Sequence, residues 1–198
     1  GASDVTSTSA LLSGNVVTDN GATVTERGFV WVIGDDTPTI SSHKIKVDGT
    51  LGDFSTLLDN LDPNKKYSFR AYALNSEGTS YGEIVTFTTI AGLPSLTSVD
   101  VASITSTGAT FSSCVIGHGG STVTDVGFYY STSASVDPET SSKVSQKYAK
   151  DAFSLSVNDL SIYTEYYVRA FATNAAGTAY SPVVRFTTAA SAPVVRTL

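Results

Sequence analysis

The chain has 198 residues, with 12 Lys and Arg against 18 Asp and Glu, and a formal net charge of −6. This acidic balance argues against nucleic acid or an anionic membrane surface as a partner, because both are bound through an excess of basic charge. No apolar run approaches the roughly 20 residues that span a bilayer, so we expect no membrane insertion in this segment. The hydrophobic content of 41% excludes a disordered chain, and the length allows one domain or two.

The cysteine and methionine counts bear on processing. Cys114 is the single cysteine, which excludes an intrachain disulfide. The chain has no methionine, and its first residues lack the basic and apolar stretches of a signal peptide. We interpret the chain as a piece cut from a longer protein.

The sequence contains an internal repeat. Its two halves align with each other without gaps at an offset of 99 residues. The densest match places Arg70–Asn75 on Arg169–Asn174, and a second places Phe87–Thr89 on Phe186–Thr188. Roughly a third of the aligned positions are identical, which indicates two copies of one unit.

The repeat also predicts the domain boundaries. Pro94 and Pro193 follow the two copies, and Gly1 aligns with Asp100. We therefore expect the first domain to lack about six residues of its opening strand. The predicted segments are a first domain, a short linker, a second domain and the start of a following linker or repeat, at 1–90, 91–94, 95–189 and 190–198. Because the linker is short, we expect the two domains to be arranged end to end.

Within each copy the hydrophobic pattern has a period of two, which is typical of β-strands. Tyr67, Phe69 and Ala71, for example, alternate with more polar neighbours. Dipeptides such as Asp48-Gly49 separate these runs and indicate turns. The strands predicted in the first copy, after a truncated opening strand, are 9–17, 24–33, 42–48, 53–59, 66–75 and 80–89, and the second copy adds a full opening strand at 95–103. Such short, turn-separated strands predict an all-β antiparallel sandwich in each copy.

The segment from Leu61 to Tyr67 carries a family resemblance. Its sequence, Leu-Asp-Pro-Asn-Lys-Lys-Tyr, resembles the Leu-x-Pro-x-x-x-Tyr corner of fibronectin type III domains. The resemblance implies two tandem immunoglobulin-like sandwiches with structural roles at four positions, Tyr67, Tyr166, Leu61 and Leu160. In the second copy Ser161-Ile162 replaces Asp62-Pro63. The whole pattern looks most like tandem repeats of bacterial cell-surface and secreted proteins, which implies an extracellular or cell-surface location.

The second strand departs from the family pattern. A Trp common in the family is absent, and Gly14 and Ser113 stand near its place. We expect Trp31 and Tyr130, on the neighbouring strand, to fill the space that these small residues leave.

Catalytic and metal-binding patterns are weak. His43 and His118 occupy non-equivalent positions, and we expect both to be exposed without a ligand cluster. We interpret Cys114 as a partly buried filler. Carboxylates of the first copy offer the oxygen ligands that calcium prefers, but they have no acidic counterparts in the second copy. Turn chemistry is therefore the preferred interpretation for Asp35, Asp36, Asp48 and Asp53. We expect no enzyme activity, no cofactor and no bound metal.

The outward face of the sixth strand is the best candidate for a ligand-binding site. Alternation places five aromatic and arginine side chains on this face in the two copies, namely Arg70, Tyr72, Tyr167, Arg169 and Phe171, and the neighbouring third strand offers Val30 or Tyr129 to the same surface. An arginine between aromatic rings can make cation–π contacts. These residues either stiffen the sheet surface or form a platform for a glycan or a protein, and end loops are a second candidate binding surface.

These observations predict a non-catalytic spacer in a secreted or cell-surface protein, monomeric in this segment, which projects or connects other domains of the same polypeptide. The alternative is an adhesion module that binds a glycan or protein through the outward aromatic and arginine face or the end loops.

Overall fold

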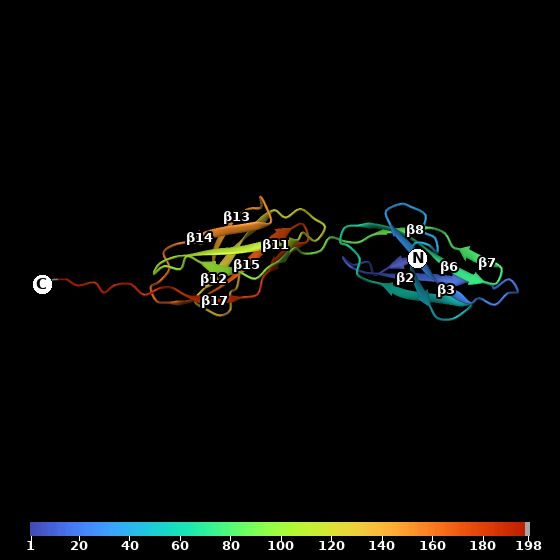
Figure 1. Ribbon diagram of the computed structural model, residues 1–198, viewed down its shortest axis with the longest axis horizontal. Coiled ribbons are helices and arrows are strands. Elements are labelled where there is room, and N and C mark those ends of the chain that lie inside the picture. The colour runs from blue at the N-terminus through green and yellow to red at the C-terminus, as the bar shows by residue number, and fades with distance from the viewer. Residues whose placement is uncertain (197–198) are drawn as a thin grey trace. The chain divides into compact units, whose positions relative to one another are not determined.

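The computed structural model describes residues 1–196 as β-strands joined by turns, with no helix among them (Figure 1). This confirms the all-β prediction. The chain divides into two compact units, with unit 1 ending at Gly92 and unit 2 beginning at Leu93. The division lies inside the segment predicted as a linker. Within residues 1–196 no helix is long and apolar enough to cross a membrane.

Unit 1 consists of two antiparallel sheets. The smaller sheet has the order β1 (Ala2–Ser3), β2 (Ala10–Val16), β5 (Gly52–Leu58). The larger sheet begins with β4 (His43–Val47), β3 (Glu26–Ile33) and β6 (Lys66–Asn75). The far edge of β6 is shared by β7 (Gly78–Tyr81) and β8 (Val85–Thr88). Strand β6 therefore pairs with three others and is the centre of the larger sheet.

Unit 2 repeats this arrangement with one addition. Its smaller sheet has β10 (Asp100–Ala102), β11 (Ala109–Gly117) and β14 (Ala152–Val157), and β9 (Ser95–Leu96) also pairs with β11. Its larger sheet contains β13 (Ser142–Lys147), β12 (Asp125–Ser131), β15 (Glu165–Asn174), β16 (Gly177–Tyr180) and β17 (Val184–Thr187). Strand β9 has no counterpart among the described strands of unit 1.

A hydrophobic core lies between the two sheets of each unit. In unit 1 the smaller sheet contributes Leu12 and Phe54, and the larger sheet contributes Phe29 and Phe69. The centroids of the Phe29 and Phe54 rings are 4.9 Å apart. Burying each such side chain stabilises a fold by roughly 1.5–3 kcal/mol. The period-two pattern thus becomes one buried face on each sheet, as a sandwich requires.

Two strands that the sequence pattern predicts as continuous are each divided in two in the structure. The strand predicted at 80–89 is divided into β7 and β8 by Gly82, Glu83 and Ile84. The strand predicted at 95–103 is divided into β9 and β10, because the Thr97 side chain takes over part of the strand pairing. Thr97 N–H donates to Cys114 O (2.9 Å), and Thr97 Oγ1 accepts from Cys114 N–H (3.0 Å). Both breaks lie in edge segments, where hydrogen bonds on one side suffice.

The prediction for Trp31 is wrong. The space beside Gly14 is filled by Phe29 and Phe54, whose ring atoms would lie 3.3 and 3.0 Å from a Cβ at position 14. Trp31 instead stacks on His43, with 4.2 Å between ring centroids. In unit 2 Ser113 is hydrogen bonded to Thr97 O (3.0 Å), and Tyr130 packs against the core with its ring centroid 5.9 Å from that of Phe111.

The turn before β6 is held by a buried tyrosine and a buried threonine. Tyr67 Oη accepts the Asp62 N–H (2.9 Å), while Thr89 Oγ1 accepts the Lys65 N–H (2.9 Å) and donates to Asp62 O (2.6 Å). Both side chains are about 2% exposed or less. Two polar side chains therefore satisfy the backbone of a turn that the core would otherwise leave unpaired.

Unit 2 has the same arrangement. Tyr166 Oη accepts the Ser161 N–H (3.0 Å), and Thr188 Oγ1 accepts the Thr164 N–H (2.9 Å) and donates to Ser161 O (2.7 Å). The two leucines that resemble the family corner, Leu61 and Leu160, are buried in their respective cores. The corner does not depend on Pro63, since Ile162 replaces it without changing these bonds.

We expect Tyr67→Phe to destabilise unit 1 by about 0.5–1.5 kcal/mol, the net contribution of the partly buried hydrogen bond from the Asp62 N–H that the change removes. Denaturant unfolding followed by Trp31 fluorescence measures this, because Trp31 is the single tryptophan and its ring lies 5.7 Å from that of Tyr67. Tyr163→Phe removes the same atom from a side chain that is 76% exposed and serves as the control. Equal midpoints for wild type and Tyr67→Phe would contradict the role of the hydroxyl.

Candidate functional site

The six predicted ligand-binding residues lie on the face of each larger sheet that points away from the core, here called the outer face. The register on β3 and β6 places Val30 opposite Arg70 and Gly28 opposite Tyr72. The register on β12 and β15 places Tyr129 opposite Arg169. Alternation along β6 and β15 therefore brings the expected side chains together in each unit, as neighbours across adjacent strands.

Two of the four aromatic rings among these six residues are covered. Tyr72 and Phe171 are each 2% exposed, so the expectation that they offer their faces to a ligand is wrong. The cause is the residue opposite each of them, which is Gly28 in unit 1 and Gly127 in unit 2. A Cβ at position 127 would lie 2.8 Å from a ring atom of Phe171. The Phe171 ring thus fills the space over Gly127 and becomes part of the sheet surface, while Tyr72 lies opposite Gly28 and bonds to Glu26.

In unit 1 Arg70 is occupied by contacts within the unit. Its guanidinium lies 3.7 Å from the centroid of the Tyr81 ring, and its Nε donates to Pro38 O (2.6 Å). The Tyr81 hydroxyl in turn accepts the Ile40 N–H (3.0 Å). The loop between β3 and β4 is thus fastened to the outer face by both members of the cation–π pair.

In unit 2 the equivalent pair is formed, but the loop does not hydrogen bond to it. Arg169 lies 4.1 Å from the centroid of the Tyr180 ring, and among the described residues its buried Nε has no hydrogen-bond partner. Tyr129 packs against Phe171 and Tyr180, with ring centroids 5.0 and 6.2 Å away. Lys143 Nζ lies 4.7 Å from the Phe171 centroid. This gives unit 2 a more aromatic outer face, with an arginine that stacks on a tyrosine but is not hydrogen bonded to the loop at its Nε.

Tyr167 lies on the same face, but next to charged groups. Its hydroxyl donates to Glu165 Oε1 (2.6 Å), and this bond to a carboxylate raises the pKa of Tyr167. Arg185, directly opposite Tyr167, lies 3.4 Å from Glu165 Oε2. The three side chains form an exposed polar row beside the aromatic group.

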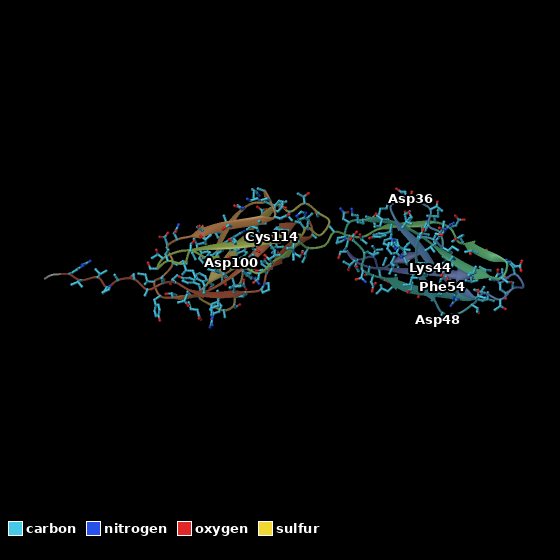
Figure 2. The ribbon with its side chains drawn as sticks, viewed as in Figure 1. Asp36, Lys44, Asp48, Phe54, Asp100 and Cys114 are labelled. Atoms are coloured by element: carbon cyan, nitrogen blue, oxygen red, sulfur yellow. The ribbon has the colours of Figure 1, made fainter. Side chains whose placement is uncertain are left out.

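Glu26 joins three partners on the outer face of unit 1. It accepts from Lys44 Nζ (2.9 Å) and from the Tyr72 hydroxyl (2.8 Å), and it forms an ion pair with Lys46. The hydrogen bonds from Lys46, Lys44 and Tyr72 lower the pKa of Glu26 to about 2. Burial, together with the hydrogen bond to Glu26, raises the pKa of Tyr72. Figure 2 labels Lys44 on this unit.

The two histidines have partners that the sequence did not indicate. His43 stacks on Trp31 as described above. His118 Nε2 lies 2.7 Å from Asp151 Oδ1 and 3.0 Å from the Tyr148 hydroxyl, which donates to Asp151 (2.5 Å). The bonds from Tyr148 and His118 lower the pKa of Asp151. These three side chains lie at the surface and link the β13–β14 turn to the end of β11.

The acidic residues considered for calcium lie apart. Figure 2 shows Asp36 and Asp48 on opposite sides of unit 1. Asp35 pairs with Lys66, and Asp53 accepts from the Asn15 side chain. Over residues 1–196, no three His, Cys, Asp or Glu side chains are close enough together to hold a metal ion. Cys114, also labelled in Figure 2, is partly buried on β11.

Comparison of the sequence with protein-family models and with curated proteins finds no match. The functional argument therefore depends on the contacts described above.

Several structurally important residues are identical in the two copies, an identity that served above only as evidence for the repeat. Thr89 and Thr188, and Tyr81 and Tyr180, are identical across the 99-residue offset, which marks them as shared parts of the unit. Arg27 has no such signal, because Val126 stands at its equivalent position. It is 7% exposed and donates to Asp48 O and Leu51 O (2.8 and 2.9 Å), which holds the β4–β5 turn.

We expect Glu26 to titrate at about pH 2. A carboxyl whose pKa is lowered in the fold contributes stability above its unfolded pKa, and that contribution is lost as the pH falls towards the folded value. NMR titration of the Glu26 carboxyl carbon measures the midpoint. Tyr72→Phe removes one donor and raises the midpoint, whereas Tyr81→Phe, whose hydroxyl bonds to Ile40, leaves it unchanged. A wild-type midpoint near 4.5 would rule out the three-partner arrangement.

Proposed function

We propose that this chain is a non-catalytic structural segment of a secreted or cell-surface bacterial protein. It consists of two fibronectin type III-like units that connect or project other domains of the same polypeptide, and it acts as a monomer.

The corner before β6 and β15 supports the family resemblance. In both units a tyrosine hydroxyl accepts a backbone N–H five residues upstream, at Asp62 and at Ser161. Hydrogen bonding of this tyrosine to nearby upstream backbone defines the tyrosine corner of such sandwiches. The resemblance in turn supports the proposed location.

The observation that carries the spacer function is the state of the outer face. In unit 1 its arginine and tyrosines bond within the unit, since Arg70 bonds to Pro38, Tyr81 to Ile40 and Tyr72 to Glu26. Groups that hold a loop and cover a glycine stiffen the domain. A connector benefits from such stiffness, because it transmits position between the domains that it joins.

A second function, glycan or protein binding, is favoured by one feature of unit 2. Arg169 makes its cation–π contact with Tyr180 but has no hydrogen-bond partner at Nε within residues 1–196. Tyr180 is 40% exposed and Tyr129 partly so. An exposed aromatic ring beside a cation can bind a sugar ring or a peptide side chain. Unit 2 is therefore the candidate unit for this binding function.

A glycan array probed with wild type, Tyr129→Ala and Tyr167→Ala separates the two functions. The spacer function predicts no specific binding by any of the three proteins. Tyr163→Ala, which removes a tyrosine that is 76% exposed and outside the outer face, is the matched control. Specific binding that is lost in Tyr129→Ala or Tyr167→Ala and retained in Tyr163→Ala would replace the spacer with the binding function.

A further inference from the structure

The loop between β2 and β3 of unit 1 contains a chemically reactive pair of residues. Asn20 is the one asparagine of the sequence that is followed by glycine. In such a pair the glycine nitrogen can attack the side-chain carbonyl of the asparagine, because a glycine has no side chain to hinder the approach. Both Asn20 and Gly21 are exposed, and a Cβ placed on Gly21 would have no neighbour within 4 Å. The pair is therefore accessible to water and sterically open.

The backbone holds this pair in a tight turn. The Ala22 N–H donates to Asp19 O (3.2 Å), and φ is +50° at Asn20 and +87° at Gly21. Positive φ at both central residues is the type I′ turn, in which ψ of the first central residue is about +30°. With this ψ, the Gly21 nitrogen and the Asn20 Cβ are about 150° apart around the Cα–C bond. Attack requires the two atoms on the same side of that bond, so the closed turn blocks it.

Asn75, the last residue of β6, holds the turn closed. Its side-chain NH₂ donates to Asp19 O (3.2 Å) and to Ala22 O (3.1 Å), the carbonyl groups at the two ends of the turn. Its Oδ1 accepts the Glu77 N–H (3.0 Å), which orients the amide. The Gly21 N–H donates to Asp19 Oδ1 (3.0 Å), so the attacking nitrogen is also engaged. All of these bonds favour the unreactive conformation.

Unit 2 forms an equivalent turn without the reactive pair. Gly119 and Gly120 occupy the two central positions, with φ of +65° and +72°. Asn174 Nδ2 donates to His118 O (2.9 Å), the carbonyl at the start of that turn. The turn and its asparagine clamp are thus common to both units, whereas the asparagine at the centre of the turn, Asn20, belongs to unit 1.

We propose that Asn20 is a site of spontaneous deamidation in unit 1, and that Asn75 sets its rate by holding the turn closed. When the turn opens, the Gly21 nitrogen gives its proton to a solvent base and bonds to Asn20 Cγ, and the side-chain nitrogen leaves as ammonia. Water then opens the resulting succinimide ring at either carbonyl. The product is aspartate or isoaspartate at position 20, and water is the only reactant consumed.

Both products weaken the clamp on the turn. Each adds a negative charge beside Asp19, and like charges at this distance repel. Isoaspartate also adds a methylene group to the backbone between Asp19 O and Ala22 O, so the two carbonyl groups no longer match the NH₂ group of Asn75. Deamidation therefore loosens the contact between the β2–β3 loop and the end of β6, in unit 1 and not in unit 2.

The test incubates the full chain at mildly alkaline pH and follows the tryptic peptide 1–27, whose one basic residue is Arg27. The mass increase from replacing NH by O measures deamidation, and fragmentation locates it. The free peptide of the same sequence lacks Asn75 and gives the rate without the clamp. We expect Asn20 to react at least about tenfold more slowly in the folded chain than in the free peptide, because only the open turn reacts. Asn15, in the same peptide but followed by valine, should stay unmodified.

Asn75→Asp is the decisive variant. It keeps an oxygen that accepts the Glu77 N–H, but it replaces the donating NH₂ by an oxygen that faces the two turn carbonyl groups. We expect Asn20 to react at least about fivefold faster than in wild type, as the loss of two hydrogen bonds predicts. Asn174→Asp makes the same change at the equivalent position of unit 2 and should leave the rate unchanged.

Two further variants separate opening of the turn from unfolding of the unit. Ala22→Pro removes the N–H that closes the turn, and it should speed the reaction even if Asn75→Asp does not fold. Tyr67→Phe destabilises the whole of unit 1 without touching the turn, and it should leave the rate unchanged. Trp31 fluorescence reports whether unit 1 is folded in each protein.

Equal rates at Asn20 in the folded chain and the free peptide would overturn the proposal, because the turn would then give no protection. Wild-type rates in folded Asn75→Asp and in Ala22→Pro would also overturn it, as would the absence of reaction at Asn20 in every protein. An acceleration in Tyr67→Phe as large as that in Asn75→Asp would assign the reaction to global unfolding and would remove the role of the clamp.

Discussion

The bonds between a buried tyrosine, a buried threonine and the turn before the central strand are the constraint on which each unit depends. That turn carries the chain from one sheet to the other, and backbone groups of Asp62 and Lys65 find their hydrogen-bond partners in these two side chains. Tyr67 and Thr89 satisfy it in unit 1, and Tyr166 and Thr188 in unit 2. Thr89 immediately follows β8. The same bonds therefore join the end of β8 to the turn that precedes β6.

The position of the central strand then determines the chemistry of the outer face. β6 pairs with β3, β7 and β8, so fixing its start fixes which side chains meet across three strand pairs. Arg70 reaches Tyr81 on β7, and Tyr72 lies opposite Gly28 on β3. The cation–π pair recurs in unit 2 with Arg169 and Tyr180. The units differ in the loop between the third and fourth strands, which bonds to this pair in unit 1 only.

Much of the fold is predictable from local pattern, because each strand reports its buried face through alternation. The boundaries of β6, Lys66–Asn75, coincide with the predicted range, since its alternation is strong and the corner precedes it. The division into β9 and β10 was not predictable in this way, because a threonine side chain replaces a backbone bond there. Arg27 was not predictable either, since its role depends on carbonyl groups of a turn 21 to 25 residues away.

The candidate site also shows that local alternation does not predict contacts that depend on tertiary structure. Alternation correctly assigns Tyr72 to the outer face, yet facing outward did not make its ring accessible. Accessibility depends on the residue opposite, and the pairing register that places Gly28 there is a tertiary property. For the same reason the contrast between Arg70 and Arg169 is invisible in the sequence, where both lie in the same Arg-Ala motif. One is capped by a loop carbonyl and the other is not. A repeated residue therefore keeps its place in the sheet, while the loops that differ between repeats decide whether its polar atoms find a hydrogen-bond partner.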